Sequence, residues 1–544
     1  MTTPGILQYL EQHGLLTVDQ SRILQLEATR TQQQIEHLLV EMNFITSNAL
    51  IQLMSLKDNI DTIDIKHTSI KHDIAQKLPH DYCRKHQILP FDQDSNNTYI
   101  AITKQLDLHI KDHIKHQFPN THLIFLLANT HDLLETIDDV FTDNKTIAHW
   151  MKLLDQQYTI DESFAIRILA DLLTECIKKR ASDIHFEPEE FFVRIRLRID
   201  GVLKQLCIIP KDKWKNLCVR IKILANMDIT HALSSQDGHF SMKIFGKTVD
   251  MRISTHPVVY GENTVIRILD KHKSLATLDD LGYTSNNLAL LNNIMQHTHG
   301  IFIVTGPTGS GKSTLMCSML MKMNKPDISI TTIEDPVEYS IPYFRQTDLQ
   351  QYKQMNIASA ARSILRQDPD IISISEIRDN ETASIAMRAA MTGRLVLTTL
   401  HTTDVFSVFD RLHDMGINKN VLASHLTGIV NQRLVRKLCR HCKITREATH
   451  EEKQLLAPFK CTQICDAKGC EKCHYTGYNG RMAVAQILPI NSEIKQILLQ
   501  NDIHTAARLL YAQNHVHSLN DAMKQQIVQL ETSIEEINRI HFLD

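Results

Sequence analysis

The sequence contains no hydrophobic segment long enough to cross a membrane. A spanning helix needs about 20 consecutive apolar residues, and the apolar runs here are short, as in LIFLLA at 123–128. The N-terminal stretch MTTPGILQYLEQHG also lacks the positively charged region with which a secretory signal begins. Both absences favour a cytosolic protein over an integral membrane protein or an exported one.

The chain also lacks a strong excess of charge and any low-complexity tract. Its 59 basic and 62 acidic residues leave a formal net charge of −3, which argues against an extended nucleic-acid-binding surface. Its 43% of hydrophobic and 22% of charged residues are typical of a folded protein. Because a single core stops growing at roughly 250–300 residues, a length of 544 residues predicts three or more domains.

Hydrophobic periodicity divides the first half of the chain into three segments. Residues 1–60 repeat apolar side chains every three or four positions, which predicts a helical subdomain. Residues 61–145 mix short apolar runs with helical stretches, which predicts an α/β subdomain. Residues 160–272 open with a helical pattern and continue with alternating stretches such as FFVRIRLRIDGVL, which predict a second α/β domain.

The second half of the chain has the pattern of a parallel sheet. Within residues 281–544, the apolar runs IFIV, DISITTI, IISIS and LVLTTL are each followed by a helix or turn. Buried parallel strands have this appearance, so we predict a doubly wound α/β domain that ends in a helical tail at 499–544. The fold class predicted for the whole chain is multidomain α/β.

A phosphate-binding loop lies between the first of these strands and a helix. The segment GPTGSGKS at 306–313 fits the pattern G-x-x-x-x-G-K-[ST]. Its glycines allow backbone N–H groups to surround a phosphate, Lys312 neutralises phosphate oxygens, and the Ser313 hydroxyl is suited to Mg²⁺. The residues expected to bind ATP are Gly306, Pro307, Thr308, Gly309, Ser310, Gly311, Lys312, Ser313 and Thr314.

Acidic residues and one histidine follow the neighbouring strands. Glu334 and Glu376 come at the ends of the ISITTI and IISIS runs, and His401 ends LVLTTLH. Since the carboxyl ends of parallel strands face the ligand crevice, all three side chains are candidates for the γ-phosphate region. We assign Glu376 to polarising the attacking water and Glu334 to a magnesium-linked role, with the reverse assignment open, whereas Asp379 is expected only to cap a helix.

Regularly spaced cysteines predict a metal site. Of the eleven cysteines, Cys439 and Cys442 form one C-x-x-C pair, and Cys470 and Cys473 form another. Thiols in a cytosolic protein are reduced, and two such pairs can complete a closed tetrahedral zinc site of structural type. A looser pair, Cys461 and Cys465, offers alternative ligands.

Taken together, these motifs resemble one family. GPTGSGKST, TTIEDPVEY, ILRQDPDIISISEIRD and TGRLVLTTLHTTD are similar to the Walker A, Asp box, Walker B and His box of the ATPases that drive type II secretion and type IV pilus assembly. Upstream stretches such as ASDIHFEP and VDMRIST extend the resemblance, which covers about residues 160–490. It implies a RecA-like P-loop domain, preceded by a PAS-like α/β domain and a mostly helical N-terminal domain.

The resemblance also implies an assembly and its partners. Members of this family form cytoplasmic homohexameric rings that bind ATP and Mg²⁺ between two α/β domains, in which Arg252 and Arg267 would act as arginine fingers. The N-terminal domain would dock onto an inner-membrane platform or a membrane-anchored adaptor of a bacterium, so the protein would be peripheral to the membrane and would not bind nucleic acid. Binding of cyclic di-GMP is not expected, since QIEHLLVEMNFIT has glutamine and isoleucine where the corresponding motif has arginine and leucine, and asparagine where it has glycine.

The cysteine pairs and two differences from the usual family motifs refine this interpretation. Assembly-type members carry a tetracysteine insert, here predicted at 434–482 and using the outer cysteine pairs, and pilus-retraction relatives generally lack it. Ser375 stands where the family usually has glycine, and Arg394 where it has histidine. Turnover is therefore expected to be slow, and a hydrolysis-impaired ATP-binding scaffold is an alternative, as is a retraction or DNA-translocating relative. The motifs do not separate pilus assembly from type II secretion.

Overall fold

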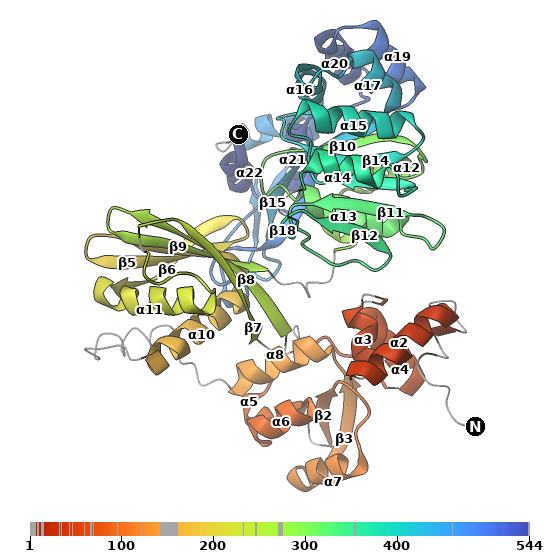
Figure 1. Ribbon diagram of the computed structural model, residues 1–544. Coiled ribbons are helices and arrows are strands. Elements are labelled where there is room, and N and C mark those ends of the chain that lie inside the picture. The colour runs from red at the N-terminus through yellow and green to blue at the C-terminus, as the bar shows by residue number, and fades with distance from the viewer. Residues whose placement is uncertain are drawn as a thin grey trace. The chain divides into compact units, whose positions relative to one another are not determined.

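The computed structural model describes residues 7–141, 162–269 and 276–541, with short gaps before residue 121 and at 232, 245–246, 353–354 and 460. The chain divides into two compact units, Met1–Ser274 and Leu275–Asp544. Figure 1 labels many of the helices and strands of both. In the described part of the chain, the helices are too short or too polar to cross a bilayer.

The N-terminal segment contains a helical cluster and a small sheet. Helices α2 (Val18–Thr31), α3 (Ile35–Glu41) and α4 (Ser47–Asp58) come first, and Leu24, Leu38 and Leu39 belong to the core that they share. Strands β1 (Ile88–Gln93), β2 (Asn97–Ile102) and β3 (His122–Leu127) then form a three-stranded sheet in that order. The helices that accompany this sheet are α5 (His72–Ala75), α6 (His80–His86), α7 (Leu108–Gln117) and α8 (Thr130–Phe141).

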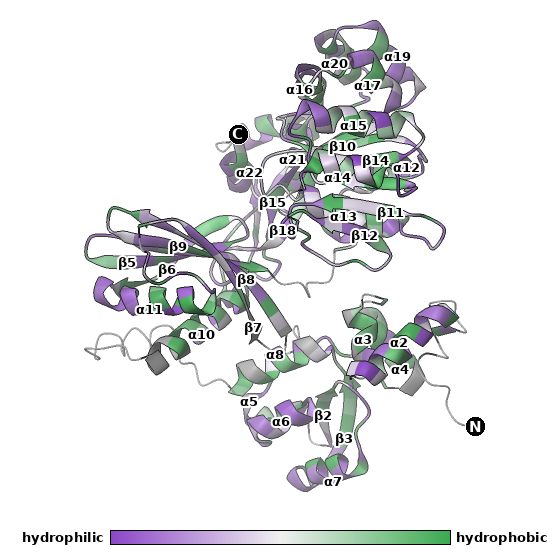
Figure 2. Ribbon diagram, in the orientation of Figure 1, coloured by the Kyte–Doolittle hydropathy of each residue, from purple (hydrophilic) through white to green (hydrophobic). Residues whose placement is uncertain are grey.

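Residues 162–269 form a six-stranded antiparallel sheet in the order β6-β5-β4-β9-β8-β7. Helix α11 alternates between hydrophobic and hydrophilic residues along its length (Figure 2) and adds Trp214, Leu217 and Ile221 to the core. Trp214 stacks on Phe186 at 4.9 Å between ring centroids. The elements are α10 (Glu162–Lys178), β4 (Ala181–Pro188), β5 (Phe192–Ile199), β6 (Val202–Pro210), α11 (Lys211–Leu224), β7 (Gln236–Ile244), β8 (Lys247–Val258) and β9 (Gly261–Leu269).

The second unit is built on a seven-stranded sheet in the order β12-β11-β13-β14-β10-β15-β18. All neighbours are parallel except β18, which runs antiparallel to β15. The strands are β10 (Gly300–Thr305), β11 (Ile330–Glu334), β12 (Phe344–Asp348), β13 (Ile371–Ile374), β14 (Leu395–Leu400), β15 (Leu426–Leu438) and β18 (Tyr478–Pro489). The predicted α/β class is confirmed, and the predicted runs IFIV, ISITTI, IISIS and LVLTTL lie on four adjacent strands.

Helices cover both faces of this sheet because its strands are apolar on both sides. Ile301 and Ile303 of β10 belong to one core, with helices α14 (Ile357–Ile364) and α15 (Asn380–Met391). Phe302 and Val304 belong to the opposite core, with α12 (Ser285–Ile294) and α13 (Lys312–Met323). The remaining helices are η2 (Leu278–Leu281), α16 (Ser407–Asp414), α17 (Lys419–His425), α18 (His450–Leu455), η3 (Ala457–Phe459), η4 (Glu471–Cys473), α19 (Ser492–Gln500), α20 (Ile503–Ala512), α21 (Leu519–Val528) and α22 (Ile534–His541).

A small excursion leaves the sheet between β15 and β18. It includes the two-stranded ribbon of β16 (Ile444–Glu447) and β17 (Gln463–Asp466) and all four cysteines of the predicted metal site. The predicted insert at 434–482 is broader than this excursion, because the ends of β15 and β18 within it pair in the main sheet.

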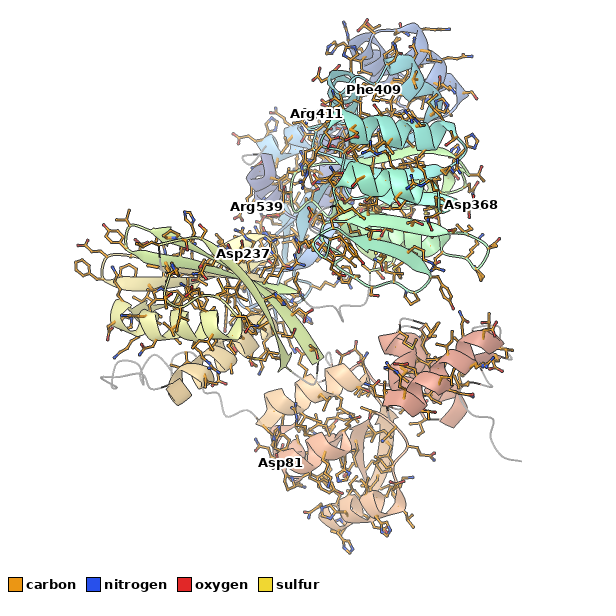
Figure 3. All side chains as sticks on the ribbon, viewed as in Figure 1. Asp81, Asp237, Asp368, Phe409, Arg411 and Arg539 are labelled. Carbon is orange, nitrogen blue, oxygen red and sulfur yellow. The ribbon has the colours of Figure 1, made fainter. Side chains whose placement is uncertain are left out.

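Helix α22 packs beside the base of the excursion. Its Glu536 is fully buried and accepts hydrogen bonds at 2.8 Å from Nε of Arg436 and from Nε of Arg539, which is labelled in Figure 3. The Arg436 guanidinium also lies 3.8 Å from the ring centroid of Tyr478, whose hydroxyl is 2.7 Å from Ser533 Oγ. Two cations thus share one carboxylate in the interior of the domain.

Candidate active site

The phosphate loop lies between β10 and α13 and depends on glycine. Gly306, Gly309 and Gly311 have φ angles of 142°, 78° and 86°, which residues with a side chain rarely adopt. A Cβ atom on Gly306 would lie 2.5 Å from the Gln432 carbonyl oxygen, and one on Gly311 would lie 2.8 Å from Gln432 Nε2. The loop therefore needs glycine both for its backbone angles and for its close contact with β15.

Lys312 is the first residue of α13, and its side chain folds back over the loop. Its Nζ donates hydrogen bonds to the carbonyl oxygens of Gly306 at 2.8 Å and Pro307 at 3.1 Å. Burial lowers the pKa of Lys312 to about 8, the nearby Glu376 acts in the opposite direction, and the Arg433 guanidinium lowers the pKa further. An incoming phosphate would raise this pKa again, because an opposite charge favours the charged state.

Glu376 lies two residues beyond the end of β13 and faces His401 from the neighbouring strand end. Its Oε2 is 3.6 Å from His401 Nε2, and its Oε1 is paired with the Arg378 guanidinium. A pocket of about 260 Å³ opens here, lined by Glu376, Ile377, Arg378, Leu400, His401 and Arg411; Arg411 is labelled in Figure 3. Burial and the charge of Lys312 lower the pKa of His401, and Glu376 partly opposes them, which favours a neutral imidazole.

Glu334 occupies the end of β11 in a different environment. Its Oε1 accepts hydrogen bonds from Thr332 Oγ1 at 2.6 Å and from Gln346 Nε2 at 2.9 Å. Neutral donors hold this carboxylate in place, whereas Glu376 lies among charged groups. Asp379, by contrast, accepts a hydrogen bond from the Thr382 N–H at 2.8 Å and caps α15, as the sequence predicted.

Comparison with known proteins settles the family. Residues 159–539 match the family model described as "Type II/IV secretion system protein", and residues 59–146 match the MshEN domain. The chain belongs to the type II/IV secretion system protein family. This confirms the resemblance inferred from the motifs, and members of this family with a phosphate loop of this kind are P-loop ATPases.

Relatives within this secretion ATPase family cover most of the chain. The chain is 38% identical to the type II secretion system ATPase E of Vibrio cholerae over 74% of its own length and 80% of the relative. It is 31% identical to the type IV pilus assembly ATPase PilB of Thermus thermophilus over 93% of its length and 58% of that protein. Its fold is similar to the X-ray structure of the Legionella pneumophila ATPase DotB, with a TM-score of 0.54 and 21% identity over 71% of this chain and 98% of DotB.

The four outer cysteines of this secretion ATPase converge. Their Sγ atoms all lie within 4.8 Å of one another, with separations of 3.9 Å for Cys439 and Cys470, and 3.8 Å for both Cys442 and Cys470 with Cys473. Zinc bound to four thiolates at about 2.3 Å requires sulfur atoms about 3.8 Å apart, so the donor set fits this metal.

The inner cysteines make other contacts. Cys465 Sγ lies 3.2 Å from Thr445 Oγ1, and Cys461 Sγ donates to the Gln463 carbonyl oxygen at 2.9 Å. In contrast, the Cys473 sulfur accepts hydrogen bonds from the backbone N–H groups of Cys470 at 3.2 Å and Gly477 at 3.3 Å. Burial acts to raise the pKa of Cys473, but these donors bring it down to about 6, whereas burial raises the pKa of Cys442 to about 12, so the thiolate form is favoured first at Cys473.

The two arginines assigned as fingers lie side by side in the first unit. Arg252 of β8 is directly opposite Arg267 of β9 in the register of the sheet. Asp183, whose side chain is 8% exposed, accepts a hydrogen bond from Arg267 Nε at 2.9 Å. Asp183 therefore holds the inner nitrogen of a guanidinium group whose side chain is 66% exposed.

Sequence reasoning missed three residues next to the phosphate loop. Asn431, Gln432 and Arg433 are consecutive polar residues in the middle of β15, and all are buried. The signal was present in the sequence, because three polar residues interrupt the apolar strand LTGIVNQRLVRKL.

Proposed function

We propose that this secretion ATPase hydrolyses ATP to drive the assembly of a type IV pilus or a type II secretion pseudopilus. The observation that carries this proposal is the grouping of Lys312, Glu376 and His401 at one edge of the sheet, beside a pocket. These are the groups that phosphate binding and water activation require.

Each side chain has a proposed role. The loop from Gly306 to Thr314 would bind the ATP phosphates, with Lys312 neutralising their charge and Ser313 holding Mg²⁺, which supplies further charge neutralisation. Glu376 would polarise the attacking water and His401 would orient Glu376 or the γ-phosphate. Glu334 would take the magnesium-linked role, for which its two hydrogen bonds fix its position.

Glu376 must change partners before it can act. In the structure, Oε1 of Glu376 is bound to Arg378 and Oε2 faces His401. A carboxylate whose two oxygens already face a guanidinium and an imidazole is not free to orient a water molecule. We infer that ATP draws Arg378 toward its phosphates and so frees Glu376 for water.

The remaining charge stabilisation would come from the first unit. Arg252 and Arg267 would reach the transferring phosphoryl group when the residue 160–272 domain closes on the ATPase domain, within a homohexameric ring. We propose that this closure moves an inner-membrane platform protein, to which the N-terminal domains dock directly or through an adaptor. The protein would thus act in the cytoplasm at the inner membrane of a bacterium.

The cysteine cluster supports assembly over retraction. Cys439, Cys442, Cys470 and Cys473 would hold a zinc ion with no open coordination position, so its contribution would be to fold the excursion and not to catalyse a reaction. The sequence resemblance associates this insert with assembly motors, and the convergence of the four sulfur atoms is what a functional insert requires.

A second candidate function is an ATP-binding scaffold that turns over little. Ser375 precedes Glu376, and its Oγ is buried without a hydrogen-bond partner in the part of the chain that the structure describes. Ser375 adds a side chain directly before Glu376, and its unsatisfied hydroxyl costs free energy, so turnover in this scaffold would be slow.

Phosphate release by the purified full-length protein with Mg²⁺ and ATP tests both candidates. Turnover well above that of Lys312→Ala supports the motor, and Ser375→Gly should then increase kcat. Tight ATP binding without release of phosphate would support the scaffold. If wild type and Lys312→Ala bind ATP equally weakly, both candidates are refuted.

A further inference from the structure

Polar side chains in the middle of a buried strand require an explanation. Gln432 is 1% exposed; it pairs with Ala485 of β18 on one side and lies one residue beyond the end of the pairing between β10 and β15 on the other. Burying an amide costs free energy unless its donor and acceptor are both satisfied. Its two hydrogen-bond partners therefore indicate why a glutamine stands at this position.

The two ends of the Gln432 amide bind different segments of the domain. Nε2 donates a hydrogen bond to the Ser310 carbonyl oxygen at 2.6 Å, in the phosphate loop. Oε1 accepts a hydrogen bond from the hydroxyl of Tyr283, which is itself buried. A single side chain thus connects the loop with the segment that contains Tyr283.

The phosphate loop also packs directly against Gln432. The first glycine of the loop, Gly306, lies against the backbone carbonyl oxygen of Gln432, and the last, Gly311, lies against its side-chain Nε2. A shift of Gln432 would therefore move the loop backbone, whose N–H groups are expected to bind phosphate.

Tyr283 belongs to the segment through which the chain enters the second unit. This entry segment, residues 276–284, is also fastened to α13, because Ser318 Oγ donates a hydrogen bond to the Ala276 carbonyl oxygen at 2.6 Å. Both the phosphate loop and the helix that follows it are therefore bonded to the part of the chain that leads to the arginine-bearing domain.

We propose that Gln432 is a positioning residue that couples the entry segment to the phosphate loop through the relay Tyr283–Gln432–Ser310. The relay holds the loop in the shape that binds ATP, so a change at Tyr283 alters nucleotide binding through Gln432. This inference deepens the proposed function and rests on ATP binding by the loop. A merely structural pair of hydrogen bonds would change stability but not nucleotide affinity.

Titration of the full-length protein with ATP and Mg²⁺ tests the relay in three variants. Gln432→Met keeps the length of the side chain and removes both hydrogen bonds, and we expect the Kd for ATP to rise about tenfold. Tyr283→Phe removes only the outer bond, and we expect a rise of about threefold. Because Tyr283 acts through Gln432, the double variant should bind ATP no more weakly than Gln432→Met alone.

A matched control separates affinity from stability. Tyr478→Phe removes another buried hydroxyl of the same domain, which contacts Ser533 Oγ at 2.7 Å on the far part of β18. It should lower the melting temperature about as much as Tyr283→Phe and leave the Kd for ATP unchanged. If Gln432→Met does not fold, the comparison of Tyr283→Phe with Tyr478→Phe decides the matter.

Three results would overturn the relay. They are an unchanged Kd in Tyr283→Phe and Gln432→Met, losses that simply add in the double variant, and an equal loss in Tyr478→Phe. Failure of the wild-type protein to bind ATP better than Lys312→Ala would instead refute the proposed function and this inference with it.

Discussion

The low pKa of Lys312 predicts an unusual dependence of ATP use on pH. The Lys312 side chain must be in its charged ammonium form to bind phosphate, and in the free enzyme its pKa is about 8. Raising the pH through this value removes the charge, so kcat/KM should fall on the alkaline side. At lower pH, protonation of His401, whose pKa lies below its usual value, should produce a second decline.

The magnitude follows from the fraction of charged lysine. With a pKa of about 8, about nine tenths of the free enzyme carries the ammonium group at pH 7 and about one tenth at pH 9. We therefore expect kcat/KM to fall about tenfold between these values. In the complex, the phosphate charges raise the pKa of Lys312, so kcat should stay nearly constant over the same range.

Steady-state hydrolysis at saturating Mg²⁺ across pH 6 to 9.5 measures both quantities. Lys312→Arg is the matched control, because a guanidinium remains charged throughout. It should have a lower kcat/KM that does not decline between pH 7 and 9. A wild-type profile that is flat to pH 9.5, or an unchanged alkaline decline in Lys312→Arg, would refute the reasoning, provided that the melting temperature shows a folded protein at each pH.

Three further predictions concern other parts of the domain. Glu376→Gln should retain ATP binding and lower kcat by about 10² to 10⁴-fold, because the group that polarises water is lost. An assay of labelled phosphate release measures this, and turnover near the wild-type level would show that another residue polarises the water. Elemental analysis should find one zinc ion per chain. Cys473→Ser should lose this zinc and have a markedly lower melting temperature. A wild-type chain that contains no zinc and is no less stable than a zinc-loaded one would contradict this. Glu536→Gln leaves Arg436 and Arg539 without their shared charge, and urea unfolding should show a loss of about 3–5 kcal/mol, whereas a loss below about 1 kcal/mol would mean that water reaches the site.

The central sheet was predictable because its strands are apolar on both faces. Runs such as IISIS and LVLTTL have few alternatives to a buried parallel strand, and the residues that follow them must then gather at one edge. The neighbourhood of Glu376 and His401 therefore followed from the order of strands and acids along the chain. The α/β class and the family also followed from these motifs.

The polar residues that interrupt the apolar run of β15 could be noticed in the sequence, but the partners of Gln432 were not predictable. Gln432 lies more than one hundred positions after the phosphate loop, and only the insertion of β15 beside β10 brings its amide under Ser310. The pairing of Arg378 with Glu376 likewise depends on side-chain conformations that no periodicity encodes. The predicted bounds of the cysteine insert were too wide for a similar reason, since the pairing of β15 with β18 in the main sheet extends to Leu438 and Tyr478.

Strand β15 has a consequence for how this gene can change in length. It carries Gln432 under the phosphate loop and, after Leu438, leads directly into Cys439. Between Gln432 and Arg436 the pairing of β15 with β18 is regular, so inserting or deleting one residue there would turn the strand residues that follow to the opposite face of the sheet. We expect length variation among descendants of this gene to fall beyond Cys442, in the ribbon of β16 and β17, where extra residues extend into solvent without disturbing the nucleotide end of the strand.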